Sequence, residues 1–171
     1  LIDTSLDHEL VSRIQNTVEG NVCVKALHSL RTRSMGGQGY IDAEIRVNPR
    51  LTVSEAHHIA FSLEQQIKTQ FPQIIDVGIH VDPLTELDHD WVTNLPSRQD
   101  ILDRLMVQWA HVDCSARIQS IQLHYLNSQI EIDLVLPLAL IDSHYQPQID
   151  DLILQATKIN FVGQVNIYFL R

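Results

Sequence analysis

The sequence is poor in basic residues, in cysteine and in long apolar runs, and each scarcity excludes a class of function. Its 12 lysines and arginines stand against 21 aspartates and glutamates, which gives a formal net charge of −9. Nucleic acids and anionic membrane surfaces are bound by basic patches, so we expect neither as a partner. The longest apolar candidate, residues 130–141, contains Glu131, Asp133 and Pro137 and is shorter than the roughly 18 residues of a membrane span.

The two cysteines, Cys23 and Cys114, lie far apart without a CxxC pair, and no secretory segment is present. This usage is typical of free thiols in a reducing compartment. The 171 residues, 44% apolar and 19% charged, suffice for one large or two small domains of an ordinary soluble globular chain. Because the chain begins at Leu1 rather than methionine, we expect it to be a piece of a longer protein.

The first half predicts two helices and three strands. One helix covers residues 6–18 with Asp7 as its N-cap, and the other opens with the capping box of Thr52 and Glu55 and runs to about Phe71. The strands are predicted in three stretches rich in β-branched residues, at residues 22–33, 40–48 and 74–81. The order α-β-β-α-β predicts an α+β fold, an open-faced sandwich in which helices cover one face of a small sheet.

Alternation along the strands assigns side chains to the two faces of this sheet. The expected core face carries apolar residues, namely Ile41, Ala43, Ile45, Val47, Ile75, Val77, Ile79 and Val81. The expected open face carries polar residues, among them Asp42, Glu44, His80 and Asp82. The second helix buries a stripe at helical spacing, formed by Val53, Ala56, Ile59, Ala60, Leu63 and Ile67, and His57 lies at the edge of that stripe.

The second half repeats the same order after an acidic, turn-rich linker at residues 85–96. A capping box of Ser97 and Asp100 opens a helix, and the remaining elements follow at residues 117–126, 130–136, 146–159 and 164–170. The sequence therefore predicts two tandem open-faced units, residues 1–84 and 97–171, related by a diverged internal duplication. In this alignment His124 falls on His28, Asp133 falls on Glu44, and Tyr168 and Leu170 fall where His80 and Asp82 stand.

The third predicted strand carries two potential metal ligands. His80 and Asp82 lie two residues apart on one face, so their Cβ atoms are about 6.5 to 7 Å apart and both side chains can reach one cation. A bulge in the first strand would bring His28 to the same face. On these residues alone, an exposed polar face at a strand end remains the alternative.

Several motifs in the first half resemble the cytoplasmic C-terminal domain of cation diffusion facilitator transporters. They occur in the family's order, at Ala26 to Arg33, Gly36, Tyr40 to Ile45, Glu55 to Ala60 and Ile79 to Pro83. The resemblance covers about residues 6–84. It implies a ferredoxin-like, metallochaperone-like fold, a V-shaped homodimer, binding of divalent metal, and a six-helix membrane domain of the same transporter outside this fragment.

The resemblance also implies the metal ligands. The family's metal-binding positions match His28, His57, His80 and Asp82, whereas Glu44 stands where the zinc and iron exporters of the family carry a histidine. Carboxylate oxygen in place of imidazole nitrogen relaxes the preference for Zn²⁺. We therefore expect Zn²⁺ first, with Mn²⁺ or Fe²⁺ admitted.

These observations give a leading hypothesis and an alternative. The chain is expected to be the cytosolic regulatory and dimerisation portion of a divalent metal efflux transporter, at the cytoplasmic face of the cell membrane. The alternative is a stand-alone soluble metallochaperone or ligand-sensing module. An enzyme is not expected, because the sequence offers no nucleophile-base pair, phosphate loop or HExxH motif.

Overall fold

The computed structural model describes residues 6–85 and 95–171, and the chain divides at Leu84 into two compact units. We call residues 6–84 the first unit and residues 95–171 the second unit. Most of the predicted linker at 85–96 lies outside the described residues. None of the helices in the described ranges is long and apolar enough to cross a membrane.

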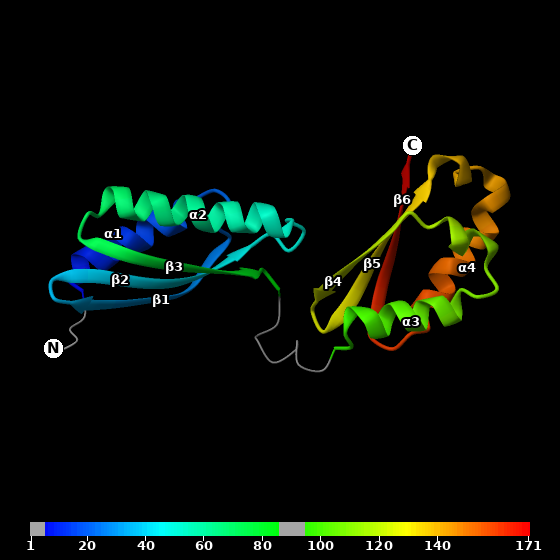
Figure 1. Cartoon of the computed structure of the whole chain (residues 1–171), viewed down its shortest axis with the longest axis horizontal. Coiled ribbons are helices and arrows are strands. Elements are labelled where there is room, and N and C mark those ends of the chain that lie inside the picture. The colour runs from blue at the N-terminus through cyan, green and yellow to red at the C-terminus, as the bar shows by residue number, and fades with distance from the viewer. Residues whose placement is uncertain (1–5, 86–94) are drawn as a thin grey trace. The chain divides into compact units, whose positions relative to one another are not determined.

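The first unit has the predicted order of elements. They are α1 (His8–Glu19), β1 (Ala26–Met35), β2 (Gln38–Val47), α2 (Val53–Gln70) and β3 (Ile74–Pro83). The sheet order is β1-β2-β3, with β1 antiparallel and β3 parallel to β2. Figure 1 shows both helices on the same side of this sheet. The open-faced α-β-β-α-β sandwich is therefore confirmed.

The core of the first unit lies between β2 and the two helices. Strand β2 buries every second residue, from Ile41 to Val47, and leaves the intervening polar residues on the other face. Helix α2 contributes Ile59, Leu63 and Ile67, of which the last two are fully buried. Because both helices pack on this one face, the opposite face of the sheet stays uncovered by any described element of the unit.

Two predicted core positions, Ile75 and Val53, and the predicted start of the first strand at Val22 are wrong. Ile75 is 42% exposed, because the pairing of β2 with β3 shifts between Gly39 and Tyr40 and Ile74 takes the buried place instead. Val53 is 89% exposed, since the first turn of α2 extends beyond the sheet-covering stripe. Val22 is 87% exposed because β1 begins only at Ala26.

The second unit repeats the architecture of the first. Its elements are α3 (Arg98–Gln108), η2 (Asp113–Arg117), β4 (Ser120–Leu126), β5 (Gln129–Pro137), η3 (Leu138–Leu140), η4 (Ser143–Tyr145), α4 (Gln146–Thr157) and β6 (Val162–Leu170). The order β4-β5-β6, with one antiparallel and one parallel pairing, matches that of the first sheet. The prediction of two tandem α-β-β-α-β folds is confirmed.

Both predicted capping boxes are present. The Thr52 side chain accepts a hydrogen bond from the Glu55 backbone N–H at 3.2 Å, and the Glu55 carboxylate accepts one from the Thr52 backbone N–H at 3.1 Å. These bonds satisfy two N–H groups that the helix itself leaves without partners. Ser97 and Asp100 form the same pair at the start of α3.

We expect Thr52→Ala to lower the free energy of unfolding of the first unit by about 1 kcal/mol, because the cap is lost. Thr69→Ala is the matched control, since the Thr69 hydroxyl bonds only back to the Gln65 carbonyl of the same helix. Urea denaturation followed by circular dichroism measures both. Equal destabilisation by the two changes would contradict the capping role.

The capping box also predicts a pH dependence. Hydrogen bonds from Thr52 lower the pKa of Glu55 below its usual value. Because the pKa of Glu55 is lowered in the folded state, its ionised carboxylate adds to the free energy of unfolding at pH values above the ordinary pKa. This contribution is lost as the pH falls through the folded-state pKa. The difference in stability between the parent and Thr52→Ala should therefore narrow in acid.

Candidate metal face of the first unit

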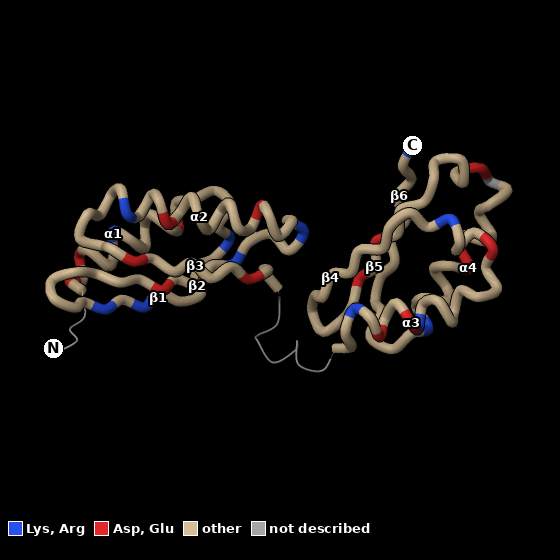
Figure 2. The backbone as a smooth tube through the Cα atoms, viewed as in Figure 1, with Lys and Arg blue, Asp and Glu red and all other residues tan. Residues whose placement is uncertain are grey.

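The uncovered face of the first sheet gathers carboxylate and imidazole groups from neighbouring strands. Glu44 of β2 is paired with His80 of β3, and adjacent strands lie about 4.8 Å apart. A hollow of about 380 Å³ opens at this place. Its lining comes from all three strands and consists of Ser29, Arg31, Asp42, Ala43, Glu44, Gly78, Ile79 and His80. Figure 2 shows basic positions along β1 and acidic positions along β2 and β3.

His80 and Asp82 already face one another. The His80 Nε2 atom lies 3.1 Å from Asp82 Oδ1, with the imidazole 73% and the carboxylate 24% exposed. Both atoms are of the types that bind Zn²⁺, Mn²⁺ and Fe²⁺. The alternation of the strand thus brings two potential ligands to one small volume, as the sequence predicted.

The hollow contains polar residues that the predicted ligand set did not include. The Ser29 hydroxyl donates to Glu44 Oε2 at 3.2 Å and so orients that carboxylate. Asp42 lies beside Gly78, and a Cβ atom at Gly78 would stand 3.0 Å from Asp42 Oδ1. Glycine at this position therefore keeps the face open next to the carboxylate. The parity of β2 had placed Asp42 on this face, but nothing in the sequence assigned it a role.

The two remaining predicted ligands occupy different places. His28 is the additional residue of a bulge in β1, because Leu27 pairs with Ile45 while Ser29 pairs with Glu44. His28 is exposed there, next to the Glu44 position. His57 is exposed near the start of α2, on the helix side of the sheet. Because β3 runs parallel to β2, the start of α2 and the Asp82 end of β3 lie at the same end of the unit.

One chain does not assemble the five predicted ligands into one site. Across residues 6–85 and 95–171, no three histidine, cysteine, aspartate or glutamate side chains gather closely enough to hold a metal ion. Of the two cysteines, Cys114 is 2% exposed in the second unit, and burial raises the pKa of its thiol. The set of His28, Glu44, His57, His80 and Asp82 stays a prediction, with Glu44, His80 and Asp82 on the uncovered face.

The same face of the second unit is apolar at the corresponding places. The pairings of Glu44 with Ser29 and His80 recur as pairings of Val135 with Ser120 and Tyr168. The next pair in the same register places Leu170 where Asp82 stands. Tyr168 is 52% and Leu170 62% exposed. The second unit therefore lacks ligand side chains at these three positions and exposes apolar ones instead.

This register corrects part of the predicted alignment of the two halves. Val135, not Asp133, stands at the Glu44 position, because the hairpin turns at 36–37 and 127–128 set the alignment. His124, likewise, is not the counterpart of His28. His124 Nε2 instead lies 2.9 Å from Asp133 Oδ2, and Asn166 Nδ2 donates to Asp133 Oδ1 at 2.8 Å. These three side chains bind one another across the second sheet.

The fold and this face define the first unit as an open-faced α-β-β-α-β domain with carboxylate and imidazole groups on its uncovered sheet. Residues 6–84 match the family model described as the cytoplasmic domain of cation efflux proteins. The first unit is a domain of that family, as the resemblance predicted. The family is one of metal transporters rather than enzymes, which agrees with the expectation of a non-enzymatic function.

Individual relatives each match about half of the chain. Metal tolerance protein 2 of Oryza sativa is 36% identical over 90 residues, covering 53% of this chain and 23% of that protein. The cation-efflux pump FieF of Pectobacterium atrosepticum is 34% identical, covering 50% and 28%. The manganese efflux system protein MneP of Bacillus subtilis is 30% identical, covering 50% and 29%. The chain thus spans only about a quarter of the length of these relatives.

A solved structure of a MamM-CTD variant also aligns with this chain. It has 22% sequence identity and a TM-score of 0.45, and the alignment covers 46% of this chain and 99% of that one.

Proposed function

We propose that the first unit is the cytosolic regulatory and dimerisation domain of a divalent metal efflux transporter, and that it binds metal between two copies. The match of residues 6–84 to cation efflux domains, and relatives named as efflux pumps, support the class of transporter. The observation that carries the metal proposal is the uncovered face on which Glu44 pairs with His80 and His80 lies 3.1 Å from Asp82.

The count of ligands favours a site shared by two copies. Zn²⁺ is held by four ligands in a closed site, and within residues 6–85 and 95–171 of one chain no three potential ligands gather closely enough to hold a metal ion. A two-fold axis beside this face would double each ligand, because symmetric dimers present the same patch on both copies. His28, on the bulge, and His57, at the Asp82 end of the unit, would complete the coordination from the edges of the face.

Charge supplies a reason why metal would favour the dimer. Each copy of this face carries Asp42, Glu44 and Asp82, with Arg31 and Arg46 at the strand positions opposite Asp42 and Asp82. Where the carboxylates of two copies meet, like charges repel at short range. A divalent cation between the copies removes that repulsion and adds bonds to both. Metal binding would therefore draw the two faces together and act as the regulatory signal.

The choice of metal follows from the donor set. Imidazole nitrogens favour Zn²⁺, whereas carboxylate oxygens accept Mn²⁺ and Fe²⁺ more readily. With His28, His57 and His80 against Glu44 and Asp82, we infer that Zn²⁺ binds most tightly and that Mn²⁺ and Fe²⁺ also bind. In the whole protein this unit would lie at the cytoplasmic face of a membrane domain encoded outside residues 1–171.

A different role follows for the second unit. Its Val135, Tyr168 and Leu170 stand where the first unit carries Glu44, His80 and Asp82. We infer that this unit binds no metal at that place and serves in pairing or support.

Sedimentation velocity tests the proposal that metal joins two copies. The chain at tens of micromolar should sediment as a homodimer, with the dimer fraction rising on addition of Zn²⁺. His80→Ala should abolish the rise, and His124→Ala, which removes an imidazole from the second sheet, should leave it intact. A strictly monomeric chain with and without metal would contradict the proposal.

A further inference from the structure

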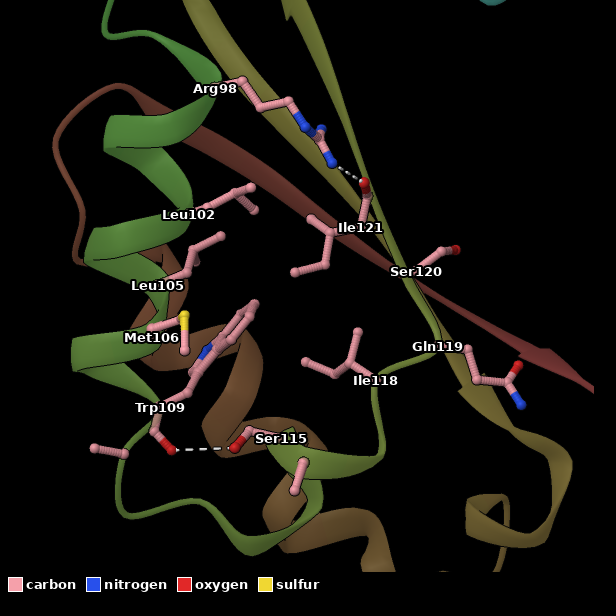
Figure 3. A pocket seen from close by; sticks show the side chains of 12 residues that line it. Arg98, Leu102, Leu105, Met106, Trp109, Ser115, Ile118, Gln119, Ser120 and Ile121 are labelled. Atoms are coloured by element: carbon pink, nitrogen blue, oxygen red, sulfur yellow. Dashed lines mark hydrogen bonds between the residues drawn. The ribbon is translucent and has the colours of Figure 1, made fainter.

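A cavity lies in the second unit, between α3, η2 and β4. Its volume is about 630 Å³, within the range of pockets that hold small molecules. Most of the lining is apolar and comes from Leu102, Leu105, Met106, Trp109, Ile118 and Ile121. In Figure 3 the α3 side chains point across the cavity toward Ile118 and Ile121.

The cavity arises from the way in which the second unit connects its first helix to its first strand. In the first unit α1 and β1 are joined by residues 20–25, whereas α3 and β4 are joined by the longer segment 109–119, which contains η2. The longer connection forms one end of the cavity, where Ser115 and Ala116 line it. The two units share one fold but differ at this place, because only the second has a long connection that lines a cavity.

The walls of the cavity are held in place. Trp109 is 3% exposed, and its Nε1 donates to the Leu152 carbonyl of α4 at 2.9 Å. The Ser115 hydroxyl donates to the Trp109 carbonyl at 3.3 Å. Leu105, which also lines the cavity, is fully buried. A cavity with anchored walls loses little conformational freedom when a ligand enters.

A basic side chain, Arg98, lies at the end of the cavity opposite Ser115. Among the described residues that line the cavity, Arg98 alone carries a charge. Its Nη2 donates to the Ile121 carbonyl at 2.9 Å, which fixes the guanidinium at the mouth next to β4. A guanidinium has five N–H donors, so this bond leaves donors for an anion.

We propose that this cavity binds a small amphipathic carboxylate, with the apolar body over Leu102, Met106 and Ile118 and the carboxylate at Arg98. Apolar lining over most of the surface and a single cation at one end match a ligand with an apolar chain and one negative charge. The ligand would touch both α3 and the edge strand β4. Because it binds the folded second unit, it should also raise the unfolding temperature of that unit.

The test uses the full chain carrying Trp91→Phe, so that Trp109 is the sole tryptophan. The probes are decanoate and its neutral analogue 1-decanol, titrated while Trp109 emission is followed. Decanoate should give a saturable change and bind more tightly than decanol. Arg98→Gln should weaken decanoate by about fivefold to tenfold and leave decanol unchanged, because only the charged head is affected. Arg104→Gln, on the same helix outside the cavity lining, is the control.

A second pair of variants tests the apolar part. Met106 and Val107 are neighbours on α3, 73% and 74% exposed, but only Met106 lines the cavity. Met106→Glu should weaken both probes at least about tenfold, because a carboxylate enters the apolar lining, whereas Val107→Glu should change them less than about twofold.

Three results would overturn the proposal. They are the absence of a saturable signal, equal binding of decanoate and decanol in the parent, or equal effects of the Met106 and Val107 changes. If Met106→Glu altered the sedimentation coefficient and not the binding of decanoate, the cavity would be a contact between copies, and the proposal would also fail.

Discussion

Replacing His80 or Asp82 by alanine is expected to weaken Zn²⁺ binding by about a hundredfold or more, since each change removes a direct ligand from a site that has few. The expectation follows from the 3.1 Å contact between the two side chains and from the pairing of His80 with Glu44. In a two-fold site each substitution removes two ligands at once, one from each copy. Calorimetric titration of the full chain with Zn²⁺ measures the loss.

The second unit supplies the matched controls for this prediction. His124 and Asp133 form a contact of the same chemical type, at 2.9 Å, on the corresponding sheet. Because Asn166 also binds Asp133, that contact is an internal network rather than a site beside an open hollow. His124→Ala and Asp133→Ala should leave Zn²⁺ affinity unchanged. If His124→Ala weakened binding as much as His80→Ala, the second unit would be a working metal domain.

The same calorimetric titrations, carried out with Zn²⁺ and with Mn²⁺, also test the role of Glu44 in metal preference. Glu44→His should tighten binding of Zn²⁺ more than that of Mn²⁺, because imidazole suits zinc whereas carboxylate suits the harder ion. An equal gain for both ions would place Glu44 outside the coordination sphere.

Leu63→Ala is expected to destabilise the first unit by about 3 kcal/mol, within the 2 to 5 kcal/mol typical of a leucine removed from a packed core. Leu63 is fully buried in the cluster that joins α2 to β2. The buried residues of the second unit form a separate cluster that contains Leu152, also fully buried. Two separate cores should unfold as two transitions, so each substitution should shift one of them.

The distribution of tryptophan makes this prediction measurable. Residues 6–84 contain none, so in a chain with Trp91→Phe the emission of Trp109 reports the second unit, while circular dichroism reports both. Leu63→Ala should move one circular dichroism transition in urea and leave the Trp109 transition in place. Leu152→Ala should do the reverse. A shift of the Trp109 transition by Leu63→Ala would show that the two cores are not independent.

Local rules predicted most of the fold from the sequence. The capping boxes at Thr52 and Ser97 begin their helices because serine and threonine satisfy the first N–H groups in any context. The alternation from Ile41 to Val47 located the core face because a strand turns each successive side chain by half a revolution. The same alternation placed Glu44, His80 and Asp82 together on the uncovered face.

Two of the errors, at Ile75 and in the alignment of the two halves, have a common physical cause, which is the way the strands pair. Ile75 was assigned to the core by parity, but the irregularity opposite Gly39 moves Ile74 inward instead. The alignment of the two halves failed at Asp133 because hairpin register, which similarity of residues does not reveal, decides which positions correspond. The cavity beside Arg98 was also not predicted, since it depends on how far η2 holds α3 from β4.

A crystal structure of the chain grown with Zn²⁺, with data collected at the zinc absorption edge, tests the central claim most directly. Our account predicts an anomalous peak on the uncovered face of the first unit, within about 2.0 to 2.2 Å of an imidazole nitrogen of His80 and a carboxylate oxygen of Asp82, with ligands from two copies. Zinc bound to His124 and Asp133 instead, or coordinated by one copy on the helix side of the sheet, would contradict it.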